Sequence, residues 1–261
     1  QHSTAQHSTA QHSTAQHSKL KRSICLVYIL CIHVLLAVLI LKTNFIPKFK
    51  DKFLNLPTAS NPHGERMIRI HAAMDASVPA GATVFLGDSI TEALATAAVS
   101  PSSVNYGIGS ATTSELLGNL SKYQSLKRAS AVFLMIGIND LSQGNSVGLS
   151  DRLRKIANAL PKDIPLLWSG IMPAYSESIE PYQIKLANQS IREICAARAG
   201  CIYVDTQEAF AAGVSELFRD GVHPNDRGYA IWIAALRNAH GQISRQKSNN
   251  SFKPRPLRGS A

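Results

Sequence analysis

Acidic residues are scarce at both ends of this chain, which carries a formal net charge of +10. Residues 1–52 contain one acidic residue against seven Lys and Arg, and residues 241–261 contain none against five. Residues 53–240, in contrast, contain 16 acidic residues against 15 basic ones. The part of the chain that is long enough to fold therefore lacks the basic surface that nucleic-acid binding requires, and we expect no nucleic-acid partner. Basic ends next to an apolar segment suit anionic lipid headgroups better.

Large apolar side chains are absent from residues 1–18, which repeat Gln-His-Ser-Thr-Ala three times and then continue with Gln-His-Ser. Such a tract cannot build a core, and we expect residues 1–22 to be disordered. Four of the nine histidines lie there, at positions His2, His7, His12 and His17. Metal binding by them is conceivable, but nothing in the repeat fixes their geometry. A passive tract is therefore favoured, and no metal is expected.

A cleavage site of the Ala-x-Ala type is absent after the apolar run at residues 23–41, which only His33 interrupts. A membrane-spanning helix needs about 20 apolar residues. We therefore interpret residues 23–41 as an uncleaved transmembrane signal anchor, in preference to a cleaved signal peptide or a buried core helix. Residues 42–79 then form a linker. Lysines flank both ends of the run, so charge does not enforce an orientation. On functional grounds we expect a membrane-anchored protein whose folded domain is periplasmic or extracellular.

Cysteine is also scarce, with four in the chain. Cys25 and Cys31 lie in the apolar run, where we expect them to pack. Cys195 and Cys201 flank a predicted helix-to-strand turn. They can form a disulfide in an oxidising compartment, but their spacing does not fix the geometry, so two separate buried thiols are equally consistent.

From residue 80 onward, short apolar runs alternate with segments of helical periodicity. Strands are predicted at residues 83–86, 104–106, 131–136, 165–171 and 202–204. Helices are predicted from about residue 91 and at residues 113–120, 147–160, 181–199 and 226–239. This alternation predicts an α/β domain over residues 80–240, with a five-stranded parallel sheet covered on both faces. A basic, disordered tail is expected at residues 241–261. Ligands of such sheets bind at the carboxyl ends of the strands.

The first predicted strand ends in Gly87-Asp88-Ser89, where a helix follows. Gly87 permits a tight turn, and the start of the helix favours negative charge next to Ser89. The sequence differs from the Gly-x-Ser-x-Gly nucleophile elbow, because Thr91 occupies the position of the second glycine. Taken alone, the motif is equally consistent with a turn and a helix cap.

The second and third strands also end in sequences with possible chemistry. Residues 105–110 read Asn-Tyr-Gly-Ile-Gly-Ser, and the two glycines let the backbone approach a ligand. They lack the Gly-x-Gly-x-x-Gly spacing and the later acidic residue of a dinucleotide-binding loop. The third strand leads to Asn139-Asp140. The Asn139 amide can donate to an oxyanion, although an Asn-Asp pair is commonly just a turn.

Histidine is absent between His71 and His240 except for His223. This residue follows Asp220 by three positions, in a loop before the last predicted helix. The spacing lets Asp220 accept a hydrogen bond from one ring nitrogen, which leaves the other nitrogen free as a base. By itself, the pattern is common in surface turns.

Together, the four sequences lie at one expected edge of the sheet and in a consistent order. They resemble the four motif blocks of the GDSL, or SGNH, hydrolase family over about residues 80–240. The stretch at residues 105–109 is similar to the platelet-activating-factor acetylhydrolase and lysophospholipase-like branch. The resemblance implies a three-layer α/β/α sandwich, here preceded by one transmembrane helix.

The resemblance also implies roles for five residues. Ser89 is expected to be the nucleophile, His223 the general base and Asp220 its orienting partner. The oxyanion hole is expected to comprise the backbone N–H groups of Ser89 and Ser110 and the side chain of Asn139. Ser110 departs from the family, which has Gly at this position, but a backbone N–H survives the change.

The function implied is a serine esterase that hydrolyses acyl esters, acetyl esters among them, of envelope glycans or lipids through an acyl-enzyme. No metal or organic cofactor is expected. An acyltransferase using the same triad on a polysaccharide is an alternative, although no multi-span acyl-donor segment is seen. A non-catalytic, tethered glycan-binding domain is a further alternative, which a substituted triad would have favoured. Trp168 and Tyr175 are candidates to line the site, but Trp168 lies in a predicted strand and is expected in the core.

Overall fold

A computed structural model describes residues 23–36, 38, 61–210 and 215–251. The chain divides into two compact units, Gln1–Ser60 and Asn61–Ala261. In the first unit, residues 23–36 are helical. No helix among the described residues is long and apolar enough to cross a membrane, so the span predicted at residues 23–41 is not confirmed. The predicted disordered tract at residues 1–22 lies outside the described residues, as do residues 39–60.

The second unit is built on a five-stranded parallel sheet in the order β2-β1-β3-β4-β5. The strands are β1 (Thr83–Gly87), β2 (Ser103–Gly107), β3 (Ala131–Met135), β4 (Leu166–Ser169) and β5 (Cys201–Val204). Every residue of β1, β3 and β4 is buried. The continuous apolar runs are therefore explained by cover on both faces of the central strands, and the predicted α/β fold with five parallel strands is confirmed.

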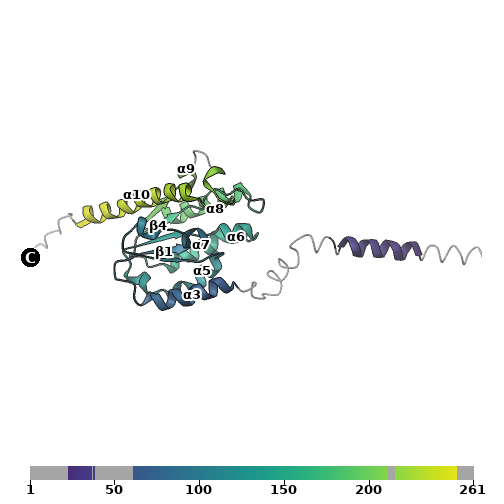
Figure 1. The fold of residues 1–261 in the computed structure, drawn as a ribbon, viewed down its shortest axis with the longest axis horizontal. Helices are drawn as coiled ribbons and strands as arrows, with labels where there is room; N and C mark the ends of the chain where they lie inside the picture. The colour runs from purple at the N-terminus through teal and green to yellow at the C-terminus, as the bar shows by residue number, and fades with distance from the viewer. Residues whose placement is uncertain (1–22, 37, 39–60, 211–214, 252–261) are drawn as a thin grey trace, which may run out of the picture. The chain divides into compact units, whose positions relative to one another are not determined.

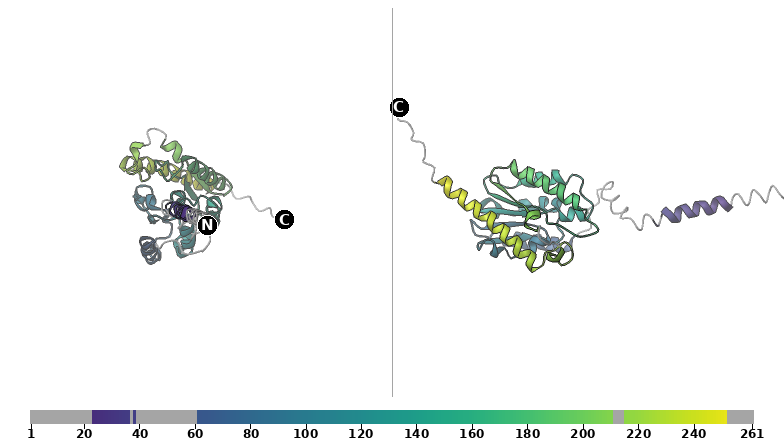
Figure 2. Two further views of the ribbon diagram at one scale, coloured as in Figure 1. Left: turned by 90° about the vertical axis from the view of Figure 1, so that its right-hand side faces the viewer. Right: turned by 90° about the horizontal axis from the view of Figure 1, so that it is seen from above.

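Helices surround this sheet. They are α3 (Pro62–Asp75), α4 (Ser89–Glu92), α5 (Thr113–Asn119), α6 (Ile138–Ser142), α7 (Leu149–Ala159), α8 (Pro181–Ala196), α9 (Thr206–Ala209) and α10 (Asp226–Ser251). Short 3₁₀ turns are η2 (Thr96–Ala98), η3 (Leu120–Lys122), η4 (Gln124–Arg128) and η5 (Ser215–Leu217). Figures 1 and 2 show α3 and α10 on opposite sides of the strands. The Trp232 indole of α10 donates to Ser169 Oγ at 3.0 Å, which joins this helix to β4.

Helix α3 occupies part of the segment that was expected to be a linker. Asn61 caps the helix by accepting a hydrogen bond from Gly64 N at 2.9 Å, and Pro62 suits the first turn. At the other end, the buried Asp75 carboxylate accepts from the Tyr106 hydroxyl at 2.8 Å. The contact spans 31 positions in sequence, so local patterns do not reveal it. The folded unit thus begins at Asn61 rather than at residue 80.

The end of the fold also differs from the expectation. Helix α10 continues to Ser251, beyond the predicted end at residue 239, and it covers the first half of the expected disordered tail. Ile243 is buried, and this apolar contact accounts for the continued helix one turn beyond the predicted end.

The two alternatives left open for Cys195 and Cys201 are also decided. The cysteines form a disulfide with their Cα atoms 5.2 Å apart. This bond joins the last turn of α8 to the first residue of β5. The short turn after α8 brings the two Cα atoms within the range that a disulfide requires.

Candidate active site

Ser89 lies where β1 gives way to α4, as the sequence predicts. The strand ends at Gly87, Asp88 caps the helix, and Ser89 is its first residue. A Cβ atom at Gly87 would lie 2.1 Å from Thr91 Oγ1 and 2.4 Å from the carbonyl oxygen of Met135. Glycine is therefore required at this turn, because a side chain would collide with the neighbouring strand.

Three side chains form a chain of hydrogen bonds at this edge of the sheet. Ser89 Oγ lies 2.8 Å from Nε2 of His223. Nδ1 of His223 lies 2.8 Å from Oδ2 of Asp220. With Nδ1 protonated and donating to the carboxylate, Nε2 has a free lone pair that can accept the Ser89 proton. The geometry is that of a nucleophile, a base and a group that orients the base.

The Asp220 carboxylate is held in its ionised form. Burial acts to raise its pKa, but hydrogen bonds outweigh this effect and lower the pKa to about 2. The donors are the backbone N–H of His223 at 2.8 Å, the His223 ring and the backbone N–H of Val222 at 3.1 Å. Asp220 therefore keeps its negative charge over the whole neutral range and remains an acceptor for the Nδ1 hydrogen of His223.

Asp88, next to Ser89, is in a different environment. Its side chain is fully buried, and burial raises its pKa to about 7. Oδ1 accepts a hydrogen bond from Ile90 N at 3.0 Å, which caps α4. Unlike Asp220, this carboxyl group makes no hydrogen bond to His223 within the described residues, so it serves the turn that carries Ser89.

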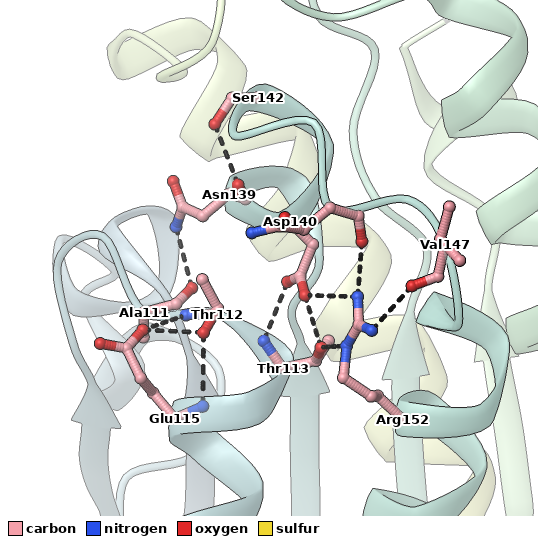
Figure 3. A network of polar contacts seen from close by, with 10 residues as sticks. Ala111, Thr112, Thr113, Glu115, Asn139, Asp140, Ser142, Val147 and Arg152 are labelled. Atoms are coloured by element: carbon pink, nitrogen blue, oxygen red, sulfur yellow. Dashed lines mark hydrogen bonds and ion pairs between the residues drawn. The ribbon is translucent and has the colours of Figure 1, made fainter. Parts of the chain in front are cut away.

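The three groups expected to donate to an oxyanion come from different loops. Ser89 opens α4, and its N–H is one of the helix-start groups without an intrahelical partner. Ser110 adopts a φ of +62°, and no other non-glycine residue described has a positive φ. Asn139 donates one amide hydrogen to the Ala111 carbonyl at 2.9 Å (Figure 3). Its second amide hydrogen makes no hydrogen bond within the described residues.

A buried polar cluster forms around Asp140, the residue that follows Asn139 in α6. The Asp140 carboxylate accepts from Thr113 Oγ1 at 2.6 Å and from Thr113 N at 2.9 Å. It also pairs with Arg152 at 3.2 Å, as Figure 3 shows. These contacts tie α6 to the start of α5 and to α7, and therefore fix the short helix that carries Asn139.

Two clefts meet at the His223–Asp220 pair. One has a volume of about 520 Å³ and is lined by Ser89, Glu92, Ala93, Arg219, Asp220 and His223. The other has a volume of about 200 Å³ and is lined by Ile138, Asn139, Ser142, Ser176, Ser178, Ile179, Asp220, Val222 and His223. Most of these side chains are polar, and the apolar ones are small or branched. The site is thus open on both sides of His223.

The structure brings together the residues that the sequence singled out and adds others. Trp168 is fully buried in β4, as predicted, whereas Tyr175 is exposed and its backbone N–H donates to Gly221 O at 2.7 Å. Glu92 and Arg219 line the cleft but were not predicted. Arg219 directly precedes Asp220, and Glu92 follows Ser89 by three positions, so nearness to the motifs was the available signal.

Similar folds occur among known structures, 68 chains of which match this one. A Streptococcus pneumoniae protein assigned as a platelet activating factor superposes with a TM-score of 0.62 at 22% identity, over 68% of this chain and 92% of that one. The catalytic domain of peptidoglycan O-acetyltransferase A from Streptococcus pneumoniae gives 0.54 at 18%, over 64% and 96%. A catalytic mutant of an acetylxylan esterase from Geobacillus stearothermophilus gives 0.51 at 20%, over 62% and 95%.

At these identities the likeness establishes the fold. No curated protein matches the chain at the level of sequence. The family model described as GDSL-like Lipase/Acylhydrolase, however, matches residues 85–231, which is more than half of the chain and includes Ser89, Asn139 and the Asp220–His223 loop. The chain therefore belongs to the GDSL-like lipase/acylhydrolase family.

Proposed function

We propose that this protein is a serine esterase that cleaves short acyl esters of polar alcohols through an acyl-enzyme on Ser89. The observation that carries the proposal is the chain of hydrogen bonds from Ser89 through His223 to Asp220, with 2.8 Å at both steps. Membership of the acylhydrolase family supports the same chemistry.

The proposed reaction has two halves. Ser89 Oγ attacks the ester carbonyl carbon while His223 Nε2 takes the serine proton. The carbonyl oxygen becomes an oxyanion that the N–H groups of Ser89 and Ser110 and the Asn139 amide stabilise. Collapse of the intermediate breaks the bond to the alcohol oxygen, which takes the proton from His223. Water then loses a proton to His223 and attacks the acyl-enzyme. Collapse of this second intermediate breaks the bond to Ser89 Oγ, which takes the proton back from His223, and the acid is released.

Asp220 has a supporting part in both halves. Its ionised carboxylate keeps the Nδ1 hydrogen in place, so that Nε2 faces Ser89 as the base. It also stabilises the imidazolium that forms when His223 holds the proton.

The lining of the clefts supports a short acyl group on a polar alcohol. The larger cleft contains Glu92, Arg219 and Asp220 beside Ser89, and the smaller one contains three serines beside Asn139. A long acyl chain would need an extended apolar channel to leave water favourably. Neither cleft offers one among the described residues, so an acetylated sugar fits the site better than a long-chain lipid.

The disulfide supports a location for this activity. Disulfides persist in oxidising compartments and are rare in the cytosol. The bond between Cys195 and Cys201 therefore favours an exported catalytic domain. Protease added to intact cells or spheroplasts tests this: digestion of the domain without lysis is expected, and full protection would place the domain in the cytoplasm.

The central experiment is a screen of the purified protein against p-nitrophenyl esters of increasing chain length and against acetylated sugars. We expect acetyl esters to be cleaved fastest and the rate to fall as the acyl chain lengthens. An absence of hydrolysis on every ester, together with no labelling of Ser89 by a serine-directed fluorophosphonate, would contradict the proposal. Transfer of acetyl groups to an added sugar, in preference to water, would instead identify the acyltransferase alternative.

A further inference from the structure

The two peptide groups on either side of Gly109, the second of which carries the Ser110 N–H, are each held by a side chain from another element. The Gly109 carbonyl accepts a hydrogen bond from Asn61 Nδ2 at 3.0 Å. The preceding N–H, that of Gly109, donates to the Glu92 carboxylate. The backbone immediately before Ser110 is therefore fixed on both sides by side chains.

The Asn61 contact bears directly on the direction of the Ser110 N–H. The Gly109 carbonyl and the Ser110 N–H belong to the same planar, trans peptide group, in which they point in opposite directions. A donor that fixes the carbonyl oxygen on one side thus fixes the N–H on the other. This N–H is the group that the proposed function assigns to the oxyanion.

Glu92 is itself a fixed acceptor. Asn105 Nδ2 donates to the carbonyl oxygens of Thr91 at 2.8 Å and of Glu92 at 3.2 Å, which anchors the end of α4. Gly107 packs tightly against the same segment, because a Cβ atom at Gly107 would lie 2.2 Å from the backbone nitrogen of Glu92. The Glu92 carboxylate also contacts His63 Nε2, at 2.9 Å and 3.0 Å. Both carboxylate oxygens are therefore engaged, and Glu92 is placed to position the loop.

Asn61 is fixed as well, because its Oδ1 caps α3 while its Nδ2 reaches Gly109. Asn61 and His63 both lie before residue 85, where the match to the family begins. The start of α3 thus lies outside the residues that the family model matches. The other end of α3 is anchored by the buried Asp75, so the helix is a rigid support.

The backbone of the loop at Ser110 is in a strained conformation. The φ of Ser110 is +62°, which lies in the left-handed region. A non-glycine residue in this conformation is strained and persists only where the surroundings impose it. The contacts of Asn61 to the Gly109 carbonyl and of Glu92 to the Gly109 N–H are the constraints that can impose it.

We propose that Asn61, His63 and Glu92, together called the Gly109 clamp, are positioning residues that hold the Ser110 N–H toward the oxyanion. This inference rests on the proposed esterase function. It assigns a role to α3, whose residues lie outside the family match. It predicts that breaking the clamp lowers the stabilisation of the transition state while substrate binding is retained.

The sharpest variant is Asn61→Asp in the full chain. Aspartate keeps the oxygen that caps α3 and is as good a cap as asparagine, but it loses the Nδ2 donor and puts an oxygen against the Gly109 carbonyl. We expect kcat to fall about 10- to 100-fold, as for other small displacements of catalytic groups, with KM within about twofold and the Tm nearly unchanged. The inhibition constant of an alkyl boronic acid, which forms a tetrahedral adduct with Ser89, should rise in parallel with the loss of kcat.

Glu92 provides a second, independent arm. Glu92→Gln retains an oxygen that can accept from Gly109 N–H and should keep kcat within about threefold, whereas Glu92→Ala should lose about tenfold or more. The control is Glu65→Gln, which removes an exposed acid from the first turn of α3 and should leave kcat unchanged.

The outcomes separate this inference from the function on which it rests. An inactive wild-type protein would overturn the proposed function. An active wild-type protein with normal kcat and boronate affinity in both Asn61→Asp and Glu92→Ala would overturn the clamp alone. Equal losses in Glu92→Gln and Glu92→Ala, accompanied by a lower Tm in both, would show a merely structural role and would also overturn it.

Discussion

Ser89 Oγ and His223 Nε2 lie 2.8 Å apart, although the two residues are separated by 134 positions in the chain. The first opens α4 directly after strand β1, and the second lies in the loop before α10. This contact depends on the parallel arrangement of the strands, whose carboxyl ends share one edge. Its consequences can be measured residue by residue.

Replacement of the nucleophile should remove the activity. We expect Ser89→Ala to lose on the order of 10⁶-fold in kcat, as in other serine triads, because no other group can form the acyl-enzyme. Esterase assays and circular dichroism of the same preparation check the loss and the fold. Ser121→Ala, at an exposed position in η3, is the matched control and should be fully active. Near-normal turnover by Ser89→Ala would eliminate the nucleophile assignment.

Removal of the Asn139 amide should affect the transition state more than the ground state. We expect Asn139→Ala to lose about 10²–10³-fold in kcat, the usual effect of deleting one oxyanion donor. The measurement is steady-state kinetics with an acetyl ester, and Asn158→Ala on the exposed face of α7 serves as control. A change confined to KM would show that Asn139 only binds substrate.

Ser110→Gly should be tolerated. The proposed donor is a backbone N–H that both residues possess, so activity should stay within about tenfold. Relief of the left-handed strain and the greater freedom of glycine in the unfolded chain oppose each other, so the free energy of unfolding should change by no more than about 1 kcal/mol. Kinetics and urea unfolding measure both. A loss as large as that of Asn139→Ala would reveal a role for the Ser110 hydroxyl.

Asp220→Asn should alter both catalysis and the response to acid. An amide in place of the carboxylate can donate to Nδ1 of His223 and so favour the wrong tautomer of the ring. We therefore expect kcat to fall on the order of 10⁴-fold. The folded-state pKa of Asp220 is about 2, below its usual 3.8, so its ionisation stabilises the fold above pH 3.8. That contribution is lost as the pH falls toward 2. Urea unfolding at several pH values should therefore show a shallower acid dependence in the variant, and an identical dependence would refute the assignment.

The contacts of Asp75 should matter for stability. Its carboxylate accepts from Tyr106, Gln124 and Ser125 in a buried site. Burial acts to raise the pKa of Asp75, but these hydrogen bonds lower it overall. We expect Asp75→Asn to lower the free energy of unfolding by about 1–3 kcal/mol at neutral pH, because amide hydrogens would face donors.

The sign of this effect gives the test. Because the pKa of Asp75 is lower in the folded state, its ionised carboxylate stabilises the protein at pH values above its unfolded-state pKa. This contribution disappears as the pH falls through the folded-state pKa. The gap in stability between Asp75→Asn and wild type should thus narrow in acid. Asp163→Asn, at an exposed turn, should show no gap at any pH. A constant gap would mean that the charge of Asp75 is unimportant.

The sequence by itself determined the sheet and the position of the candidate site. Continuous apolar runs predict the buried strands β1, β3 and β4, and helices between them require parallel pairing. Once the strands are parallel, the motifs at Ser89, Ser110 and Asn139 must lie at one edge. Asp220 and His223 could be paired because a three-residue spacing is a local relationship.

Only the tertiary structure decided the features that depend on contacts between distant parts of the chain. Helix α3 has little apolar periodicity, and its place in the fold rests on Asp75 meeting Tyr106 and on Asn61 meeting Gly109, 48 positions away. The disulfide between Cys195 and Cys201 depended on the turn geometry, which spacing leaves open. The left-handed conformation of Ser110 follows a peptide whose carbonyl accepts a hydrogen bond from the distant Asn61. Hydrogen bonds between side chains and a distant backbone leave no periodic trace in a sequence, because they require one residue at one position and no pattern around it.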